Sequence, residues 1–221
     1  DGVGTGGACP AGIPLTEGGG LIADPTILAP VTGDPNCFSF VETIPSGFVP
    51  RFGGDNTDWS IAGGVRGVFN FGSGLNYDFS AVHGSSKSEF FIRNTINASL
   101  GPDTPRDFEP GAYQQTETIL DADFSYALPV DGLASDLNIA FGSQYREEEF
   151  EITAGDPASF ALGPLADQGF SSSSNGFGGF TASSTNSQSS YAFYVDLEAD
   201  VTDQFTLQGA VRFEDYDEFG S

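Results

Sequence analysis

The sequence predicts an all-β fold of about seven antiparallel strands, and two observations lead to this prediction. Apolar residues recur at every second position over long stretches of the chain after residue 50. A repeat of 180° per residue is typical of a strand with two different faces and excludes an amphipathic helix. Short turns and long loops then alternate between these stretches.

The candidate strands follow one another in order through residues 51–221. In most of them one face is apolar and the other carries Asn, Asp, Ser or Gln. The pattern is weaker in the first and third strands. The first contains several glycines, which weaken a strand. The expected strands are 60–71, 75–81, 89–97, 118–128, 137–145, 191–201 and 205–213.

The connections divide into two kinds. Residues 72–74 and 202–204 are short turns, and residues 129–136 contain an Asp-Gly turn signal. The links 97–114 and 151–190 are long, and the second is rich in Ser and Gly, which favours flexible loop. Short turns on one side and long loops on the other are typical of an outer-membrane β-barrel.

Residues 1–50 form a separate Pro- and Gly-rich loop. Seven prolines lie there, so neither a helix nor a central strand is expected. Cys9 and Cys37 are the only cysteines of the chain. Two cysteines in one such loop predict a disulfide formed in an oxidising compartment, and a metal pair is less favoured because no histidine lies nearby.

A soluble β-sandwich would also alternate apolar and polar residues. Two features favour the barrel. A sandwich rarely contains a structureless link as long as 151–190. Its outer face is usually a mixture of Lys, Glu, Thr and Arg, whereas here the polar face is small and acidic and the chain has one lysine. The spacing of Phe69, Phe71, Tyr77 and Phe79 around one short turn also resembles an interfacial aromatic girdle.

The charge excludes nucleic acid as a partner. The chain has 7 Lys+Arg against 31 Asp+Glu, a formal net charge of −24, and residues 1–50 contain no basic residue. Phosphate backbones are bound by clustered Lys and Arg. The chain also begins without Met or a basic-then-apolar signal segment, so we expect a piece of a longer protein.

The sequence contains no pattern that predicts an enzyme or a cofactor. His83 is the only histidine, it is expected at a strand end, and no nucleophile or zinc motif accompanies it. We therefore predict no catalytic residues and no cofactor.

Three carboxylates lie at alternate positions of one predicted strand: Asp196, Glu198 and Asp200. Side by side on one face they repel one another. Water screens them, or an arginine of a neighbouring strand pairs with some of them, or they hold Ca²⁺. Solvation ranks first, ion pairing second and calcium third, so no metal site is predicted and these three are weak calcium candidates. The arginines concerned are Arg66, Arg146 and Arg212. Asp55, Asn56 and Asp58 form another weak oxygen-rich cluster.

Four short runs resemble the barrel region of TonB-dependent outer-membrane receptors. They are NTINASLGP at 94–102, IAFGSQYREE at 139–148, AGDPASF at 154–160 and RFEDYDEFGS at 212–221. The resemblance spans residues 52–221. It implies a 22-stranded barrel plugged by an N-terminal domain, which imports siderophores, cobalamin or oligosaccharides with energy delivered by TonB.

The resemblance also implies partners and a location. They are the rest of the receptor chain, the TonB system reached through segments not present here, and outer-membrane lipid, with the long loops extracellular. We expect the plug, the TonB-contacting segment and most strands to lie outside this sequence, so the ligand-binding residues stay unknown.

A second hypothesis starts from the incomplete barrel. A piece of barrel wall cannot close, so its first and last strands leave backbone groups unpaired. Such edges pair with copies of the same chain. The alternative function is therefore an excised fragment that is released and assembles into a β-rich extracellular filament.

Overall fold

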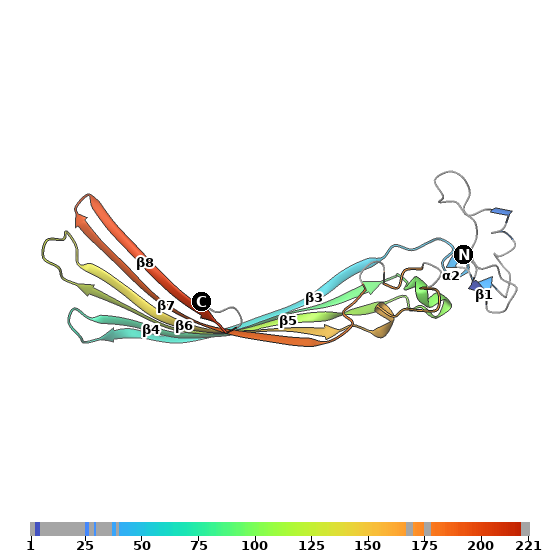
Figure 1. Ribbon diagram of the computed structural model, residues 1–221, viewed down its shortest axis with the longest axis horizontal. Coiled ribbons are helices and arrows are strands. Elements are labelled where there is room, and N and C mark those ends of the chain that lie inside the picture. The colour runs from blue at the N-terminus through green and yellow to red at the C-terminus, as the bar shows by residue number, and fades with distance from the viewer. Residues whose placement is uncertain are drawn as a thin grey trace. The chain divides into compact units, whose positions relative to one another are not determined.

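The fold is a single open sheet of long strands. The structure, a computed structural model, describes residues 3–4, 25–26, 29, 37–38, 40–166, 170–174 and 178–217. In these residues six antiparallel strands lie side by side in chain order, β3-β4-β5-β6-β7-β8, and helix is confined to short segments (Figure 1). The predicted fold class is confirmed.

The six strands are joined to a few short elements. The short elements are β1 (Val3–Gly4), β2 (Cys37–Phe38), α2 (Phe40–Thr43), and the 3₁₀ helices η1 (Ala98–Asp103) and η2 (Pro157–Ser159). The strands of the sheet are β3 (Arg51–Phe69), β4 (Leu75–Arg93), β5 (Phe108–Leu128), β6 (Leu137–Ala154), β7 (Ser184–Thr202) and β8 (Phe205–Tyr216).

The sheet has six strands where about seven were expected, because β4 is continuous. It joins the predicted strand 75–81 to the start of the predicted strand 89–97 and ends at Arg93, so residues 94–97 belong to the following connection. The intervening sequence is mostly Gly, Ser and Lys, so it carries no apolar alternation, although its backbone stays extended. Periodicity detects a strand only where one of its faces is apolar.

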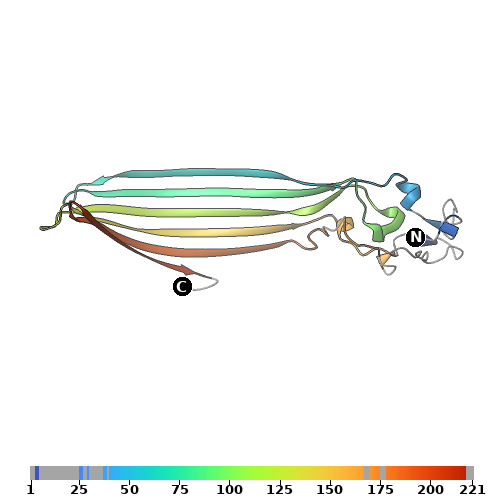
Figure 2. The same ribbon diagram turned by 90° about the horizontal axis from the view of Figure 1, so that it is seen from above.

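The alternation of short and long connections is confirmed. Residues 70–74, 129–136 and 203–204 are the short ones, and residues 94–107 and 155–183 are the long ones. In an antiparallel sheet of sequential neighbours, successive connections fall at alternate ends of the strands (Figure 2). The long link is shorter than the predicted 151–190 because β6 and β7 both extend into it.

The chain divides into two compact units that share the strands. The first unit contains residues 1–55, 88–113 and 152–183, and the second contains residues 56–87, 114–151 and 184–221. The first unit therefore holds both long connections, and the second holds the three short ones.

One face of the second unit is apolar. Aromatic rings touch from strand to strand along it: Phe79 lies 5.5 Å from Phe124, which stacks on Phe141 at 5.2 Å. Between β7 and β8 the register pairs Phe193 with Phe213 on this same face. Most large apolar side chains of this face are exposed to solvent in the isolated chain. We call it the apolar face and the opposite one the polar face.

No helix among the described residues is long and apolar enough to cross a membrane.

The loop of residues 1–50 is described only in part. Val3–Gly4 pairs antiparallel with Cys37–Phe38, with Gly4 opposite Cys37. Cys9 lies outside the described residues, and of Cys37 only the backbone is described. The predicted Cys9–Cys37 disulfide therefore stays a prediction.

Candidate functional site

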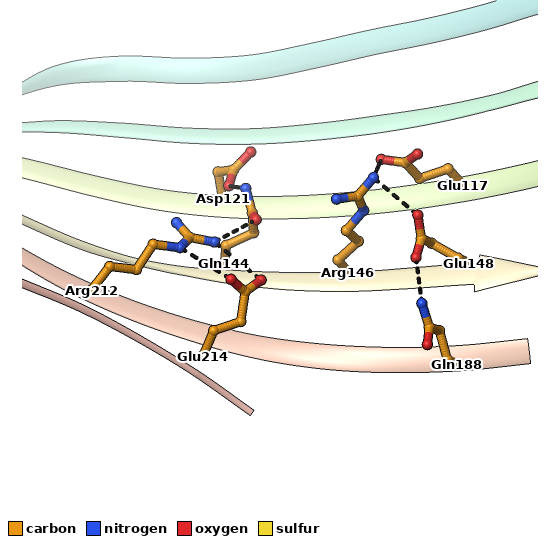
Figure 3. Close-up of polar contacts among 8 residues, drawn as sticks. All are labelled: Glu117, Asp121, Gln144, Arg146, Glu148, Gln188, Arg212 and Glu214. Atoms are coloured by element: carbon orange, nitrogen blue, oxygen red, sulfur yellow. Dashed lines mark hydrogen bonds and ion pairs between the residues drawn. The ribbon is translucent and has the colours of Figure 1, made fainter. Parts of the chain in front are cut away.

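The candidate site is the polar face of the second unit, where β5 to β8 present charged and amide side chains. Strand alternation places these residues on one face, opposite the aromatic rings. Two arginines organise them into two clusters, which Figure 3 shows side by side on neighbouring strands.

Arg146 organises the first cluster. Its Nη2 lies 3.1 Å from Oε1 of Glu117 on β5 and 3.0 Å from Oε1 of Glu148 on its own strand, β6. Gln188 on β7 then donates a hydrogen bond of 2.8 Å to the other oxygen of Glu148 (Figure 3). The four side chains join three strands, and the arginine charge is shared between two carboxylates.

Arg212 organises the second cluster, which joins β5, β6 and β8. Its Nη2 donates to Oε1 of Gln144 at 3.1 Å and forms an ion pair of 3.4 Å with Glu214. Gln144 in turn donates a hydrogen bond of 2.7 Å to Asp121 (Figure 3). The contact between Arg212 and Gln144 passes over β7, which lies between β6 and β8. On β7 the small residue Ala192, opposite Glu214 in the register, is almost fully buried.

Tyr194 makes a similar crossing in the opposite direction. Its hydroxyl donates a hydrogen bond of 2.7 Å to Asp123, so a β7 side chain reaches β5 across β6. The β6 residue beneath it is Gly142, and a Cβ there would come within 2.5 Å of both Tyr194 and Asp123. Glycine at this position leaves room for the crossing.

Next to the first cluster the polar face is hollowed into a groove of about 580 Å³. Its walls come from β5, β6 and β7. The lining residues are Gln115, Glu148, Glu149, Phe150, Thr185, Asn186, Ser187 and Gln188. This volume lies within the range of small-molecule sites.

The three carboxylates proposed for calcium lie on the polar face at alternate positions of β7. Asp196 accepts a hydrogen bond of 2.9 Å from Gln208, and Asp200 accepts one of 2.5 Å from Thr206. Glu198 lies opposite Gln208 in the register. In the described part of the chain no three His, Cys, Asp or Glu side chains converge on a metal position.

Two of the three arginines expected beside these carboxylates have other partners. Arg146 binds Glu117 and Glu148, and Arg212 binds Gln144 and Glu214. Neutral donors from β8 serve Asp196 and Asp200 instead.

His83 does not end a strand, as the sequence had predicted, but lies inside the continuous β4. Its Nδ1 is 2.9 Å from the Thr118 hydroxyl, and its ring is 5.3 Å from Trp59.

The first unit contains an interlocked pair of loops centred on Asn97, which is fully buried. Its Nδ2 donates to the carbonyls of Ala158 at 2.8 Å and Ala161 at 3.0 Å, and its Oδ1 accepts from the Ser99 hydroxyl at 2.7 Å. Ser99 extends the link, since its own Oγ accepts from the Gly163 amide at 3.0 Å. The connections 94–107 and 155–183 are thus held together by hydrogen bonds.

The comparison with protein families agrees with this architecture. An open sheet with an apolar face, a polar face and alternating connections belongs to the class of outer-membrane barrel walls. The model of the family described as TonB dependent receptor-like, beta-barrel matches residues 26–221. The chain therefore belongs to this outer-membrane family. No curated protein and no solved structure matched the chain.

The sequence predicted the polar face but not the contacts on it. Both crossings depend on three or more strands in register, whereas alternation within one strand gives no information on register. The only sequence feature that could have indicated these cross-strand contacts was a small residue, Gly142 or Ala192, next to residues with long side chains. The loop residue Asn97 appeared only at the end of the predicted strand 89–97 and in a family-like run, although the structure gives it five hydrogen bonds.

Proposed function

We propose that the chain forms part of the barrel wall and outer loops of a TonB-dependent receptor that takes up a nutrient across the outer membrane. The apolar face lies against lipid, and the polar face lines the interior. The connections 94–107 and 155–183 are extracellular and the short turns are periplasmic. The partners are the rest of the receptor and the TonB system.

One observation carries this proposal: on the neighbouring strands β7 and β8 the apolar face ends at a similar level, because Phe193 lies opposite Phe213 and Tyr191 lies opposite Asp215. On β7 it runs from Tyr191 to Val201, and the residues before Tyr191 are Ser, Thr, Asn and Gln. On β8 it runs from Phe205 to Phe213 and is followed by Asp215 and Asp217. Tilted membrane strands need about 9–11 residues to cross the hydrocarbon core.

Sided labelling tests the orientation. The variants Asp103→Cys, in η1, and Asp131→Cys, in the turn 129–136, place thiols at exposed positions, with Cys9 and Cys37 replaced by Ser in both. A membrane-impermeant maleimide applied to intact cells should label position 103 and not position 131. Disrupted cells should label at both. Equal labelling of the two positions in intact cells contradicts the proposed orientation.

Uptake is tested separately in a strain that lacks the gene. Loss of growth on one nutrient, restored by the gene only when TonB is present, supports a receptor function. Restoration without TonB contradicts it.

A second candidate function, self-assembly into a β-rich filament, follows from the sheet edges. In the described residues β3 and β8 each pair with one strand of the sheet. The edge strand β8 also exposes large apolar side chains, including Val211 at 75% exposure. The missing neighbours would be other barrel strands in a receptor or copies of the chain in a released fragment.

Negative-stain electron microscopy of the chain in detergent-free buffer separates these two candidates. Regular filaments favour self-assembly. Monodisperse particles that persist at high protein concentration contradict it.

A further inference from the structure

We propose that residues 40–50, which precede β3, form a strap that detaches from the two long connections while these connections stay joined to each other. All three segments belong to the first unit. The inference goes beyond the proposed receptor function, and only the outer location of the strap rests on that function. It depends on the difference between the contacts that hold the strap and the contacts that join the two connections.

The strap is held at Asn94, the first residue after β4. The Nδ2 atom of Asn94 donates a hydrogen bond of 3.0 Å to the carbonyl of Val49, and its Oδ1 accepts one of 2.5 Å from Nη2 of Arg106. The guanidinium of Arg106 also lies over the ring of Phe48, 5.5 Å from its centroid. Two neighbouring strap residues are therefore held by the connection 94–107, and we call Asn94 and Arg106 the clasp.

The clasp is exposed, and its backbone is strained. Both hydrogen bonds of the Asn94 side chain lie at the surface, so water replaces them as soon as they break. Asn94 has a φ of 55°, and no other non-glycine residue in the described ranges has a positive φ. Asparagine reaches this left-handed region more easily than most residues, but still at a cost in backbone energy. The closed clasp is therefore held against that cost.

The guanidinium of Arg106 adds a second cost to the closed state. Its Nε atom is buried and has no hydrogen-bond partner among the described residues. The Phe48 ring packs on this guanidinium, so release of the ring opens the guanidinium to water. Part of what the cation–π contact contributes is thus recovered as hydration when the strap detaches.

The other end of the strap is held by apolar packing. The ring of Phe40, in α2, lies 6.1 Å from the ring of Phe170 in the connection 155–183, and both residues are half-buried. Gly47 lies between this end and the clasp. It has a φ of 71°, and a Cβ added there would have no atom within 4 Å. The strap therefore has room to bend at Gly47 when the clasp opens.

The contacts between the two connections are of a different kind. Asn97 is fully buried, and its side chain takes part in four hydrogen bonds, which join Ser99 to Ala158 and Ala161. These groups must leave the interior before water can replace their bonds, so this opening costs more. Because weakly held, exposed segments open at lower free energy than buried ones, the strap opens first and leaves the loop pair unchanged.

Double electron–electron resonance between pairs of spin labels tests this order of opening. The protein is expressed from its complete gene, with its native cysteines replaced by serine, and purified from outer membranes in detergent. The strap labels, at Ser46→Cys and Asp103→Cys, report the distance from the strap to the connection 94–107. The loop labels, at Asp103→Cys and Leu162→Cys, report the distance between the two connections. All three positions are exposed.

Four variants separate the two sets of contacts. Asn94→Ala removes the clasp bonds, so it should broaden the distance distribution of the strap labels by several ångströms and leave that of the loop labels unchanged. Asn94→Gly removes the same bonds but accepts a positive φ without strain, so it should broaden the strap distribution less. Asn97→Ala should broaden the distribution of the loop labels. Glu109→Ala is the matched control, because it removes an exposed ion pair with Arg93 just beyond the same connection, and it should change neither distribution.

Three outcomes overturn the inference. Broadening of both distributions in Asn94→Ala would mean that the strap and the loop pair open as one body. The other two are an unchanged strap distribution in both Asn94 variants, and a change in Glu109→Ala equal to that in Asn94→Ala. The sided labelling of positions 103 and 131 does not depend on these results. Incorrect labelling rejects the outer location and leaves the strap in place, whereas correct labelling with any of the three outcomes rejects the strap alone.

Discussion

Replacing Asn97 by alanine should release the two long loops from each other. Asn97 is fully buried, and its side chain donates to Ala158 and Ala161 and accepts from Ser99. Alanine removes the donor to the part-buried Ala158 carbonyl and the acceptor of the buried Ser99 hydroxyl, whereas the Ala161 carbonyl still has the Ser99 hydroxyl within 3.3 Å. Each such orphaned group costs about 1–3 kcal/mol, so we expect a local loss of about 3 kcal/mol in the free energy of opening the loop pair.

Hydrogen exchange followed by mass spectrometry measures this loss. The amides of Gly163 and Leu165 donate to the Ser99 hydroxyl and carbonyl, so they report on the interlock directly. A loss of about 3 kcal/mol lowers their protection by about two orders of magnitude. Amides in the paired segment of β7 and β8 should exchange as before.

The control for this experiment is Asp103→Ala, an exposed position in the same connection. It should leave the protection of both amides within a few fold of the unaltered protein. Unchanged protection in Asn97→Ala would refute the reasoning, and so would an equal loss in the control.

Three further predictions concern packing, the apolar face and the cysteines. Gly163→Ala should destabilise the loop pair by about 2 kcal/mol, because the added Cβ would overlap the Ser99 carbonyl. Gly209→Ala is the control, since no atom lies within 4 Å of its added Cβ. Limited proteolysis of the loops should be faster in the first variant and unchanged in the second. Val211→Arg on the apolar face should destabilise the protein by about 2 kcal/mol and so lower the amount of heat-modifiable folded protein in outer membranes. Ala210→Arg on the polar face should be tolerated, and equal losses in the two variants would contradict the assignment of the faces. Cys9 and Cys37 should resist thiol alkylation until a reductant is added, and alkylation of the untreated protein would exclude the disulfide.

The sequence predicted well the apolar strand segments that are long enough to cross a membrane, and it predicted poorly the polar segments that extend these strands. In β7 the predicted segment 191–201 matches the apolar part of Ser184–Thr202. The first residues of this strand are polar on both faces, so alternation gives no signal there. Their extended form depends on pairing with neighbouring strands, which no single segment of sequence specifies.

The loops show even more clearly that local sequence does not specify contacts between distant segments. The composition of residues 151–190 suggested a flexible link, yet part of it forms η2 and binds the other long connection. The Asp156 side chain accepts from the Ser159 amide at 2.9 Å, a local cap that the sequence Asp-Pro-Ala-Ser allows one to expect. The contact between Asn97 and Ala158 joins residues far apart in the chain, so local sequence could not predict it.

Trp59 offers a test of where the apolar face meets the membrane surface. It is the only tryptophan of the chain, it is 52% exposed, and it is the last large apolar residue of that face before Thr57 and Asp55 on β3. An indole at the end of an apolar band lies at the level of the lipid headgroups, where its N–H stays hydrated. In the proposed orientation, Trp59 therefore marks the extracellular interface.

Fluorescence quenching measures the depth of this ring without any substitution. The protein is reconstituted in vesicles whose lipids carry bromine at acyl positions near the headgroup or near the bilayer centre. We expect strong quenching by the shallow bromines and weak quenching by the deep ones, because the interfacial level lies about 15 Å from the bilayer centre. Stronger quenching by the deep bromines would place the ring inside the hydrocarbon and shift the assigned band along every strand. No quenching by either lipid would mean that the apolar face does not contact lipid, and the barrel-wall proposal would then fail at its main premise.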